Sequence, residues 1–358
     1  MVKKILLLLF FLFSFLPLSP AEAAMISEKQ EIAMGEQVAK QLEAQYGLVQ
    51  DEDIQTRVSA IGQKLLQHGT RPGLTYSFKV LNTPDVNALA CPGGYIYIYK
   101  GLLDYMTSDD ELAAVMGHEI GHIEKRHTVH QLEKQMTLSL LSVLAGIASG
   151  EPGAGMVLAT TASQALMAGY SRADEREADQ EGFRLSTLAG YNPYGIYVTM
   201  AKLDDMSKEL GNPGYGLFSS HPEPEVRMQK ALQWIKPMHI QEHVTVDTNG
   251  TATVSMGDWQ FSITATAGYD KPVYRAYLMA GGLYLAQKEG PVDESHFRTV
   301  DGDNWTDIFY EDIRLLRVYP QDNIQNGNTG EMALSIVGKL QQWAKLAQGE
   351  TSGKGSRG

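Results

Sequence analysis

Residues 118–122 of this 358-residue chain have the sequence His-Glu-Ile-Gly-His, which predicts one particular kind of helix. On an α-helix, residues four positions apart lie on one face, so His118 and His122 can direct ring nitrogens at the same point. Glu119 then lies beside that point. Imidazoles that hold a zinc ion, with a carboxylate that takes a proton from water, are the groups that zinc hydrolases use. The alternative is a surface helix whose histidines bind nothing.

The residues around this stretch favour a helix. Ser108-Asp109-Asp110-Glu111 has the pattern of a capping box, and its acidic side chains suit the positive end of a helix. Farther along, apolar residues recur at the spacing of a core-facing stripe, at Leu112, Val115, Met116 and Ile123.

A catalytic zinc site needs a third protein ligand. One class of zinc proteases extends the motif with a glycine and then a histidine, six residues after the second ligand. Lys125 and Thr128 occupy those two positions here, so that class is excluded. We expect His127 and His130, beside Lys125 and Arg126, to form the solvated basic end of the helix.

A better source of the third ligand is the segment 171–179, Ser-Arg-Ala-Asp-Glu-Arg-Glu-Ala-Asp. Glu175 and Asp179 are again four residues apart, on one helical face. One of these carboxylates can bind a metal while the other orients a ligand histidine. The alternative is an exposed, salt-bridged helix face, which alternating charges usually indicate.

These motifs and two others occur in the order found in the M48 peptidases, and the chain resembles the soluble, exported branch of that family of gluzincin metalloendopeptidases. The additional motifs are His221-Pro222 with Arg227, and the segment from Asn87 to Leu103 that precedes the predicted zinc helix. The resemblance covers residues from about 27 to 235.

The resemblance implies one zinc ion per chain, bound by His118, His122 and Glu175. It also implies that Glu119 is the general base and that Asp179 supports a ligand from behind.

The resemblance also places His221 and Arg227 near the site as catalytic residues. Both could donate hydrogen bonds to the oxyanion of a tetrahedral intermediate. His221 could instead bind the metal as a fourth ligand in a closed resting state. A histidine before a proline can also have a purely structural role.

The segment 95–99, Tyr-Ile-Tyr-Ile-Tyr, alternates strictly and predicts a strand with one aromatic and one aliphatic face. In the family that the chain resembles, a strand beside the zinc cleft is an edge strand, to which an extended peptide can add. The alternative is an ordinary core hairpin. We expect substrate to bind at Asn87, Gly94, Tyr95, Ile96 and Tyr97.

The expected fold class is α+β, and the chain divides into four segments. Residues 1–23 have the pattern of a signal peptide, with Lys3-Lys4, an apolar run and Ala21-Glu22-Ala23. Residues 24–240 are expected to form a mainly helical zincin-type metalloprotease domain with a small antiparallel sheet edging the active-site cleft. Residues 241–348 are expected to form a smaller C-terminal α+β module, and residues 349–358 a disordered tail.

Within the C-terminal module, alternating apolar residues around Asn249-Gly250 predict strands between 244 and 265. Helices are expected at 274–285 and 332–346, and residues 308–318 could be strand or helix. No motif in this module carries chemistry.

Composition limits the classes of partner and compartment. A formal net charge of −12 argues against nucleic-acid binding. The single cysteine, Cys91, excludes an intramolecular disulfide, and we expect a small, partly buried side chain there. The leader predicts export to the periplasm or cell envelope, with secretion as the second choice. The apolar run 138–147 is too short to span a bilayer; a buried helix is the first interpretation, and a lid or a membrane-surface contact is the second.

The leading hypothesis is therefore a zinc metalloendopeptidase acting on envelope proteins, in a quality-control role that rests on the resemblance alone. The alternative is a latent protease that acts mainly as a periplasmic holdase or assembly factor through its C-terminal module, with peripheral contact to the membrane or an envelope complex. A metal-storing protein is a weaker third hypothesis, because Glu119 would then have no role.

Overall fold

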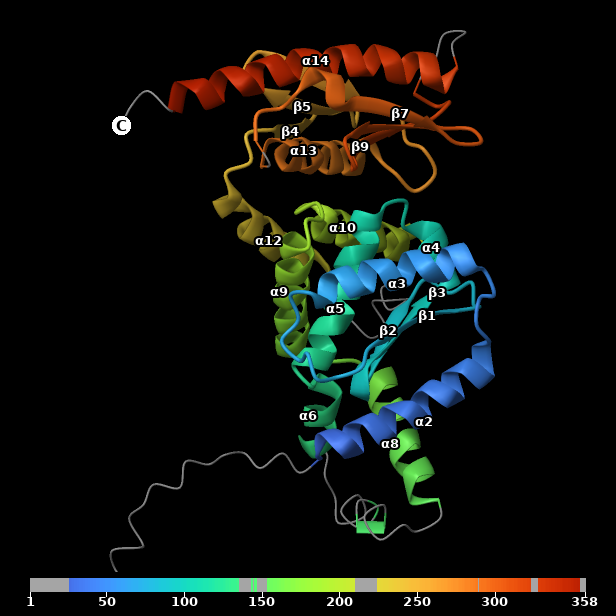
Figure 1. Ribbon diagram of the computed structural model, residues 1–358. Coiled ribbons are helices and arrows are strands. Elements are labelled where there is room, and N and C mark those ends of the chain that lie inside the picture. Colours follow the sequence, from blue (N-terminus) through green and yellow to red (C-terminus); the bar gives the residue numbers. More distant parts are fainter. Residues whose placement is uncertain are drawn as a thin grey trace, which may run out of the picture.

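The computed structural model describes residues 26–134, 143, 145–146, 153–209, 224–288, 290–322 and 328–354. Two lobes are stacked on one another, and helix α12 (Pro224–Ile235) leads from the lower lobe towards the upper one (Figure 1). Helices dominate and the sheets are small, so the predicted α+β fold class is confirmed. His221, the leader and most of the apolar run 138–147 lie outside the described residues.

The N-terminal lobe is a helical body around one three-stranded sheet. Its elements are α2 (Glu28–Tyr46), α3 (Glu52–Leu66), β1 (Ser77–Leu81), β2 (Ala88–Cys91), η2 (Pro92–Gly94), β3 (Tyr95–Tyr99), α4 (Lys100–Tyr105), α5 (Asp109–Glu124), α6 (His127–Lys134), α8 (Ala154–Ala168), α9 (Arg172–Leu188) and α10 (Gly195–Glu209).

The sheet has the strand order β1-β3-β2, with β3 in the centre. β2 and β3 form an antiparallel hairpin through the turn at Gly93 and Gly94, both of which have a positive φ. β1 pairs with the other side of β3 in parallel, so this sheet is mixed rather than purely antiparallel. The expectation that residues 95–99 form an edge strand was wrong, because β1 crosses over to cover their far side.

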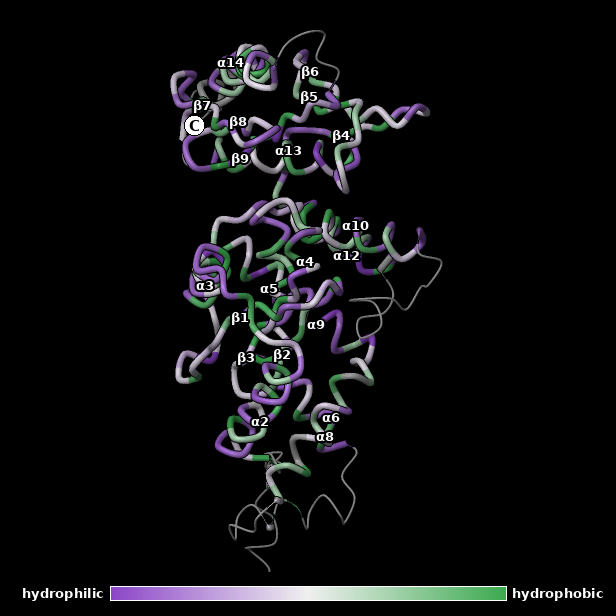
Figure 2. Tube along the Cα trace, turned by 90° about the vertical axis from the view of Figure 1, so that its right-hand side faces the viewer, coloured by the Kyte–Doolittle hydropathy of each residue, from purple (hydrophilic) through white to green (hydrophobic). Residues whose placement is uncertain are grey.

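The predicted two faces of β3 are confirmed. Ile96 and Ile98 lie in the core formed with α3 and α5. Tyr97 and Tyr99 lie on the other face, in a second cluster with residues of α2, α6 and α8. Figure 2 shows the same pattern, with hydrophobic residues gathered on the strands and on α5 inside the lobe. The sheet therefore forms a middle layer that supports α5.

Helix α5 begins where the sequence predicts. Ser108 is its N-cap and accepts a hydrogen bond from the Glu111 backbone N–H at 3.2 Å. Three acidic residues occupy the first turn, where they complement the helix dipole.

Glycines allow α5 and α9 to pack backbone against backbone. A Cβ added to Gly117 would lie 2.9 Å from the Gly182 carbonyl oxygen, and one added to Gly121 would lie 2.9 Å from the Ala178 carbonyl oxygen. A Cβ on Gly182 would meet the His118 nitrogen at 2.6 Å. Only residues without a side chain permit this contact, which brings the second carboxylate motif beside the first histidine motif.

The C-terminal lobe places two three-stranded antiparallel sheets between two helices, α13 on one side and α14 on the other (Figure 1). Short 3₁₀ turns precede the lobe at η3 (Lys236–Met238) and occur within it at η4 (Glu294–His296). Its other elements are β4 (His243–Val246), β5 (Ala252–Met256), β6 (Trp259–Ile263), α13 (Pro272–Lys288), β7 (Phe297–Asp301), β8 (Thr306–Tyr310), β9 (Ile313–Val318) and α14 (Thr329–Lys354).

The predicted hairpins and both helices of this lobe are present. The ambiguous segment 308–318 belongs to two strands, β8 and β9, joined by a tight turn at Glu311, whose φ is 50°. Helix α14 runs to Lys354 and so includes residues 349–354 of the segment expected to be a disordered tail. For residues 355–358, which lie outside the described part of the chain, the expectation stays a prediction. Once a packed helix exists, each added residue gains a backbone hydrogen bond, which lets it extend into a weakly helical sequence.

The C-terminal lobe is tied to the predicted metal helix by a buried charge cluster. Lys202 on α10 is 0% exposed, and its Nζ lies 2.8 Å from Glu111 Oε1 in the first turn of α5 and 2.8 Å from Asp270 Oδ1 in the upper lobe. Next to it, the Arg314 guanidinium donates to the Thr107 carbonyl oxygen at 2.8 Å. The two lobes therefore meet at the start of α5.

No helix among the described residues is long and apolar enough to cross a bilayer.

Replacing Lys202 with Met should destabilise the whole chain. The substitution leaves two buried carboxylates without their shared cation, and breaking such a pair costs about 3–5 kcal/mol. The free energy of unfolding from urea titration measures the loss. Lys208→Met is the matched control on the same helix. The Lys208 ammonium is exposed, although its partner Asp204 is largely buried, and its ion pairs should contribute less than about 1 kcal/mol. Equal losses for the two variants would contradict the assignment.

Candidate functional site

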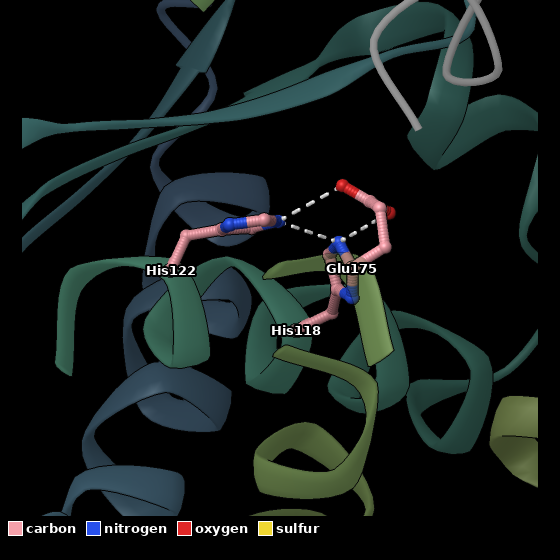
Figure 3. Close-up of side chains that lie close together, drawn as sticks. All are labelled: His118, His122 and Glu175. Atoms are coloured by element: carbon pink, nitrogen blue, oxygen red, sulfur yellow. Dashed lines mark hydrogen bonds and ion pairs between the residues drawn. The ribbon is translucent and has the colours of Figure 1, made fainter. Parts of the chain in front are cut away.

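Three of the predicted ligand side chains converge between α5 and α9 (Figure 3). His118 and His122 direct their Nε2 atoms at one another, 3.0 Å apart. Glu175 closes the group, with carboxylate oxygens 3.7 Å from His118 Nε2 and 3.5 Å from His122 Nε2. All three side chains are buried, with exposed fractions of 5%, 2% and 1%.

These distances fit a metal ion. Ligand atoms about 2.1 Å from a tetrahedral zinc ion are about 3.4 Å from one another, close to the three separations in this cluster. Two imidazoles and one carboxylate are also a donor set that suits zinc. The residues could therefore hold a zinc ion without a change of backbone.

Glu119 occupies the position expected of a neighbouring base. It follows His118 on α5 and its side chain is 0% exposed. A carboxylate beside a metal site but outside the ligand set can take a proton from a polarised water molecule.

Asp179 holds His118 from behind. Its Oδ1 lies 2.8 Å from His118 Nδ1, the ring nitrogen that points away from the cluster. A ligand histidine that donates its second N–H to a carboxylate is fixed in orientation and is a stronger metal ligand. The capping box of Ser171 and Asp174, which starts α9, sets the register of this carboxylate.

Arg227, on α12, joins the two carboxylates of α9. Its Nε and one terminal nitrogen each donate to Asp179 at 2.7 Å, and its other terminal nitrogen lies 3.0 Å from Glu175. Burial alone would raise the pKa of Asp179, but the Arg227 charge, with help from His118, lowers that pKa to about 2. Asp179 therefore stays ionised at neutral pH.

These contacts indicate a structural role for Arg227 that the sequence did not suggest. We interpret it as the cation that balances Asp179 and Glu175, and its role as an oxyanion donor stays a prediction. The predicted role of His221 also stays a prediction.

The prediction for His127 was wrong. Its side chain is 2% exposed, not solvated, and it contacts His122. Arg126, whose φ is 54°, interrupts the helix between α5 and α6, and the next residue, His127, lies against His122. Burial lowers the pKa of His127, which favours the neutral ring. His130 is exposed, as expected.

Tyr170 also contacts the site, although no sequence motif indicated it. Its ring stacks on His122 with centroids 3.8 Å apart and an interplanar angle of 18°. Its hydroxyl pairs with the Thr128 hydroxyl at 2.8 Å. Cys91 is fully buried rather than partly buried, and burial raises the pKa of its thiol.

The five predicted substrate-binding residues lie in or beside the β2–β3 hairpin. Tyr95, Ile96 and Tyr97 pair with strands on both sides, so their backbone has no edge to offer a peptide. Gly94 is buried in the turn. Asn87 directs its side-chain oxygen at the Ala88 N–H, 2.9 Å away, and so covers the start of β2.

The edge strand beside α5 is β2. Residues opposite one another in an antiparallel pair alternate between bonded and non-bonded positions. Since the Tyr99 N–H donates to the Asn87 carbonyl oxygen, Ala88 and Ala90 direct their backbone groups away from β3. Ala90 and His122 both line one small cavity of about 10 Å³. The edge of β2 thus borders the metal cluster.

Comparison with known proteins agrees with this geometry. A family model described as Peptidase family M48 matches residues 52–235, which include α5, α9 and α12. The beta-barrel assembly-enhancing protease of Yersinia pestis is 29% identical over 216 residues, covering 58% of this chain and 44% of that protein. Metalloprotease YcaL of Escherichia coli strain K12 is 31% identical over 221 residues, covering 59% of this chain and 79% of that protein.

A third relative comes from an organelle. The mitochondrial metalloendopeptidase OMA1 of Arabidopsis thaliana is 32% identical over 163 residues, covering 45% of this chain and 32% of that protein. The chain thus matches less than half the length of the Yersinia protein.

Replacing Arg227 with Met should destabilise the metal-free protein. Two buried carboxylates would lose their counter-charge, which costs about 3–5 kcal/mol, measured as the free energy of unfolding in urea. Lys230→Met, at an exposed position on the same helix, should change it by less than about 0.5 kcal/mol. Unchanged stability with a large loss of turnover would favour the oxyanion role instead.

Proposed function

The chain belongs to peptidase family M48, and from that premise we propose that it is a zinc-dependent metalloendopeptidase that hydrolyses protein substrates. The observation that carries the proposal is the convergence of two Nε2 atoms and one carboxylate beside the buried Glu119.

The proposed division of labour follows from the contacts. His118, His122 and Glu175 hold the ion, and Asp179 with Arg227 keeps His118 and Glu175 in place. A zinc ion supplies Lewis acidity, which lowers the pKa of a water molecule and polarises a peptide carbonyl. Glu119 takes the proton of the attacking water and returns it to the leaving amine.

We propose that substrate adds to β2 as an extended strand. The outward backbone groups of Ala88 and Ala90 lie on the side of the sheet that borders His122. Main-chain hydrogen bonds of this kind hold a peptide regardless of its side chains, which suits a protease that acts on many unfolded proteins. Asn87 would release the Ala88 N–H when a peptide binds.

We also propose that the protein works in the bacterial cell envelope, in the quality control of envelope proteins. The leader pattern of residues 1–23 and the likeness to a beta-barrel assembly-enhancing protease support this setting. The C-terminal lobe would contribute contacts to an envelope complex or a membrane surface.

The burial of all four site residues favours a second candidate. In this alternative the protease is latent at rest, and the chain acts mainly as a holdase for unfolded envelope proteins. A Glu119→Gln protein distinguishes the two: suppression of client aggregation by this variant, with little turnover by the wild type, would favour the holdase.

Glu119→Gln should abolish casein cleavage while zinc binding persists. The amide cannot accept the proton from water, and loss of general base catalysis costs about 10²–10⁴ in rate. Zinc content by elemental analysis and initial cleavage rates measure the two effects. Glu52→Gln, an exposed change on α3, should leave both the zinc content and the cleavage rate unchanged. A chelator should abolish cleavage by the wild type, and added zinc should restore it. Wild-type turnover by the Gln variant would refute the mechanism.

Backbone-methylated peptides should reveal strand addition at β2. In a β-ladder only alternate amides of the peptide face the partner strand. A methyl group on one of these amide nitrogens should therefore prevent cleavage, whereas a methyl group on the amides between them should not. The scissile amide is left unmodified in every peptide. Cleavage rates along such a peptide series provide the measurement. Equal rates at all positions would show that binding does not use the main chain.

A further inference from the structure

His127 is the only described histidine outside the metal cluster whose ring contacts a proposed ligand. Its Nδ1 lies 2.9 Å from Nδ1 of His122, with the two rings at 74° to one another. The contact lies behind the cluster, because the Nε2 atom of His122 faces Glu175 and His118.

A hydrogen bond between two imidazoles needs one donor and one acceptor. If His122 binds a metal through Nε2, its Nδ1 carries the proton and donates it. His127 Nδ1 must then accept, which places the proton of His127 on Nε2. That nitrogen faces Glu177 Oε2 at 3.4 Å and Asp174 Oδ1 at 3.9 Å, both able to accept it. The donors and acceptors therefore run in one direction: His122 donates to His127, and His127 donates towards the carboxylates of α9.

The backbone before His127 is built to hold this position. Arg126 adopts the left-handed conformation, which is unfavourable for a residue with a side chain. Its guanidinium donates to Glu31 at 2.8 Å and to the Ile26 carbonyl oxygen at 2.7 Å. These contacts with the N-terminal segment stabilise the turn that brings His127 onto His122.

Packing also restrains the His122 ring, through a contact with its flat face. Tyr170 stacks on His122, and its hydroxyl pairs with Thr128, the residue next to His127. Tyr170 therefore restrains the plane of the His122 ring, and His127 restrains the direction in which its nitrogens point.

We propose that His127 is a positioning residue for His122: it accepts the Nδ1 hydrogen bond and so directs Nε2 into the metal site. The inference rests on the proposed zinc function, and it assigns His127 no contact with metal or substrate. It gives His122 a support corresponding to the one that Asp179 gives His118. Hydrogen bonds to ligand histidines typically strengthen metal binding by about 10–100-fold.

Three variants test the proposal in the full-length protein. His127→Phe keeps a ring but removes the acceptor, and it should weaken zinc binding by about 10–100-fold, measured by competition with a chromophoric chelator. His127→Asn places an oxygen where Nδ1 stood and should recover most of the affinity. His130→Phe, at the exposed histidine of the same helix, should bind zinc like the wild type.

The outcomes separate this inference from its premise. Failure of the wild type to bind zinc would overturn the proposed function itself. Wild-type affinity in His127→Phe would overturn the positioning role alone. Equal loss of affinity in the Phe and Asn variants, together with a lower urea midpoint of the metal-free protein, would show that His127 acts only in packing and would also overturn it.

Discussion

The arrangement of the site depends on the direct contact between the backbones of α5 and α9. Gly117 and Gly121 on α5 meet Gly182 and Ala178 on α9 at distances that leave no room for a Cβ at any of the three glycines. Protein interiors are close-packed, so such a contact fixes the distance between two helices more tightly than interlocking side chains do. Because α5 carries the histidines and α9 the carboxylates, this distance sets the size of the metal cluster. Three residues of the His-Glu-Ile-Gly-His motif lie outside the proposed ligand set. Of these, Glu119 is the proposed base and Gly121 is required by packing.

Both ends of α5 are anchored by buried ion pairs to parts of the chain far away in sequence. At its start, Glu111 reaches Lys202 and through it Asp270 of the C-terminal lobe. Just beyond its end, the partly exposed Arg126 pairs with the buried Glu31 on α2. Buried pairs of this kind add little net stability, but they are costly to break. They make the orientation of α5 depend on the whole molecule, including a lobe in which we identify no catalytic motif.

The sequence predicted the local features of the site and missed those that arise from tertiary contacts. The positions of His118, His122, Glu175 and Asp179 follow from helical spacing, because residues four apart share a face in any helix. The placement of His127 could not be predicted in this way, because it depends on a left-handed turn at Arg126. The edge position expected of residues 95–99 came from the family resemblance and was wrong for a similar reason. Alternation shows that a segment is a strand, but its neighbours in a sheet are set by crossovers.

A carboxylate, Asp179, lies behind His118, whereas an imidazole, His127, lies behind His122. Electrostatics explains this difference in charge. With Glu119, Glu175 and Asp179 ionised, the described site carries three negative charges and one positive charge from Arg227. A divalent cation brings this total to zero. A second carboxylate behind His122 would leave a buried net negative charge, which is expensive in a medium of low polarity. A neutral imidazole at His127 orients the ligand without adding charge, whereas Asp179 is tolerated because Arg227 balances it. With one carboxylate and one imidazole behind the two histidines, the proposed site would therefore be neutral once a divalent ion is bound.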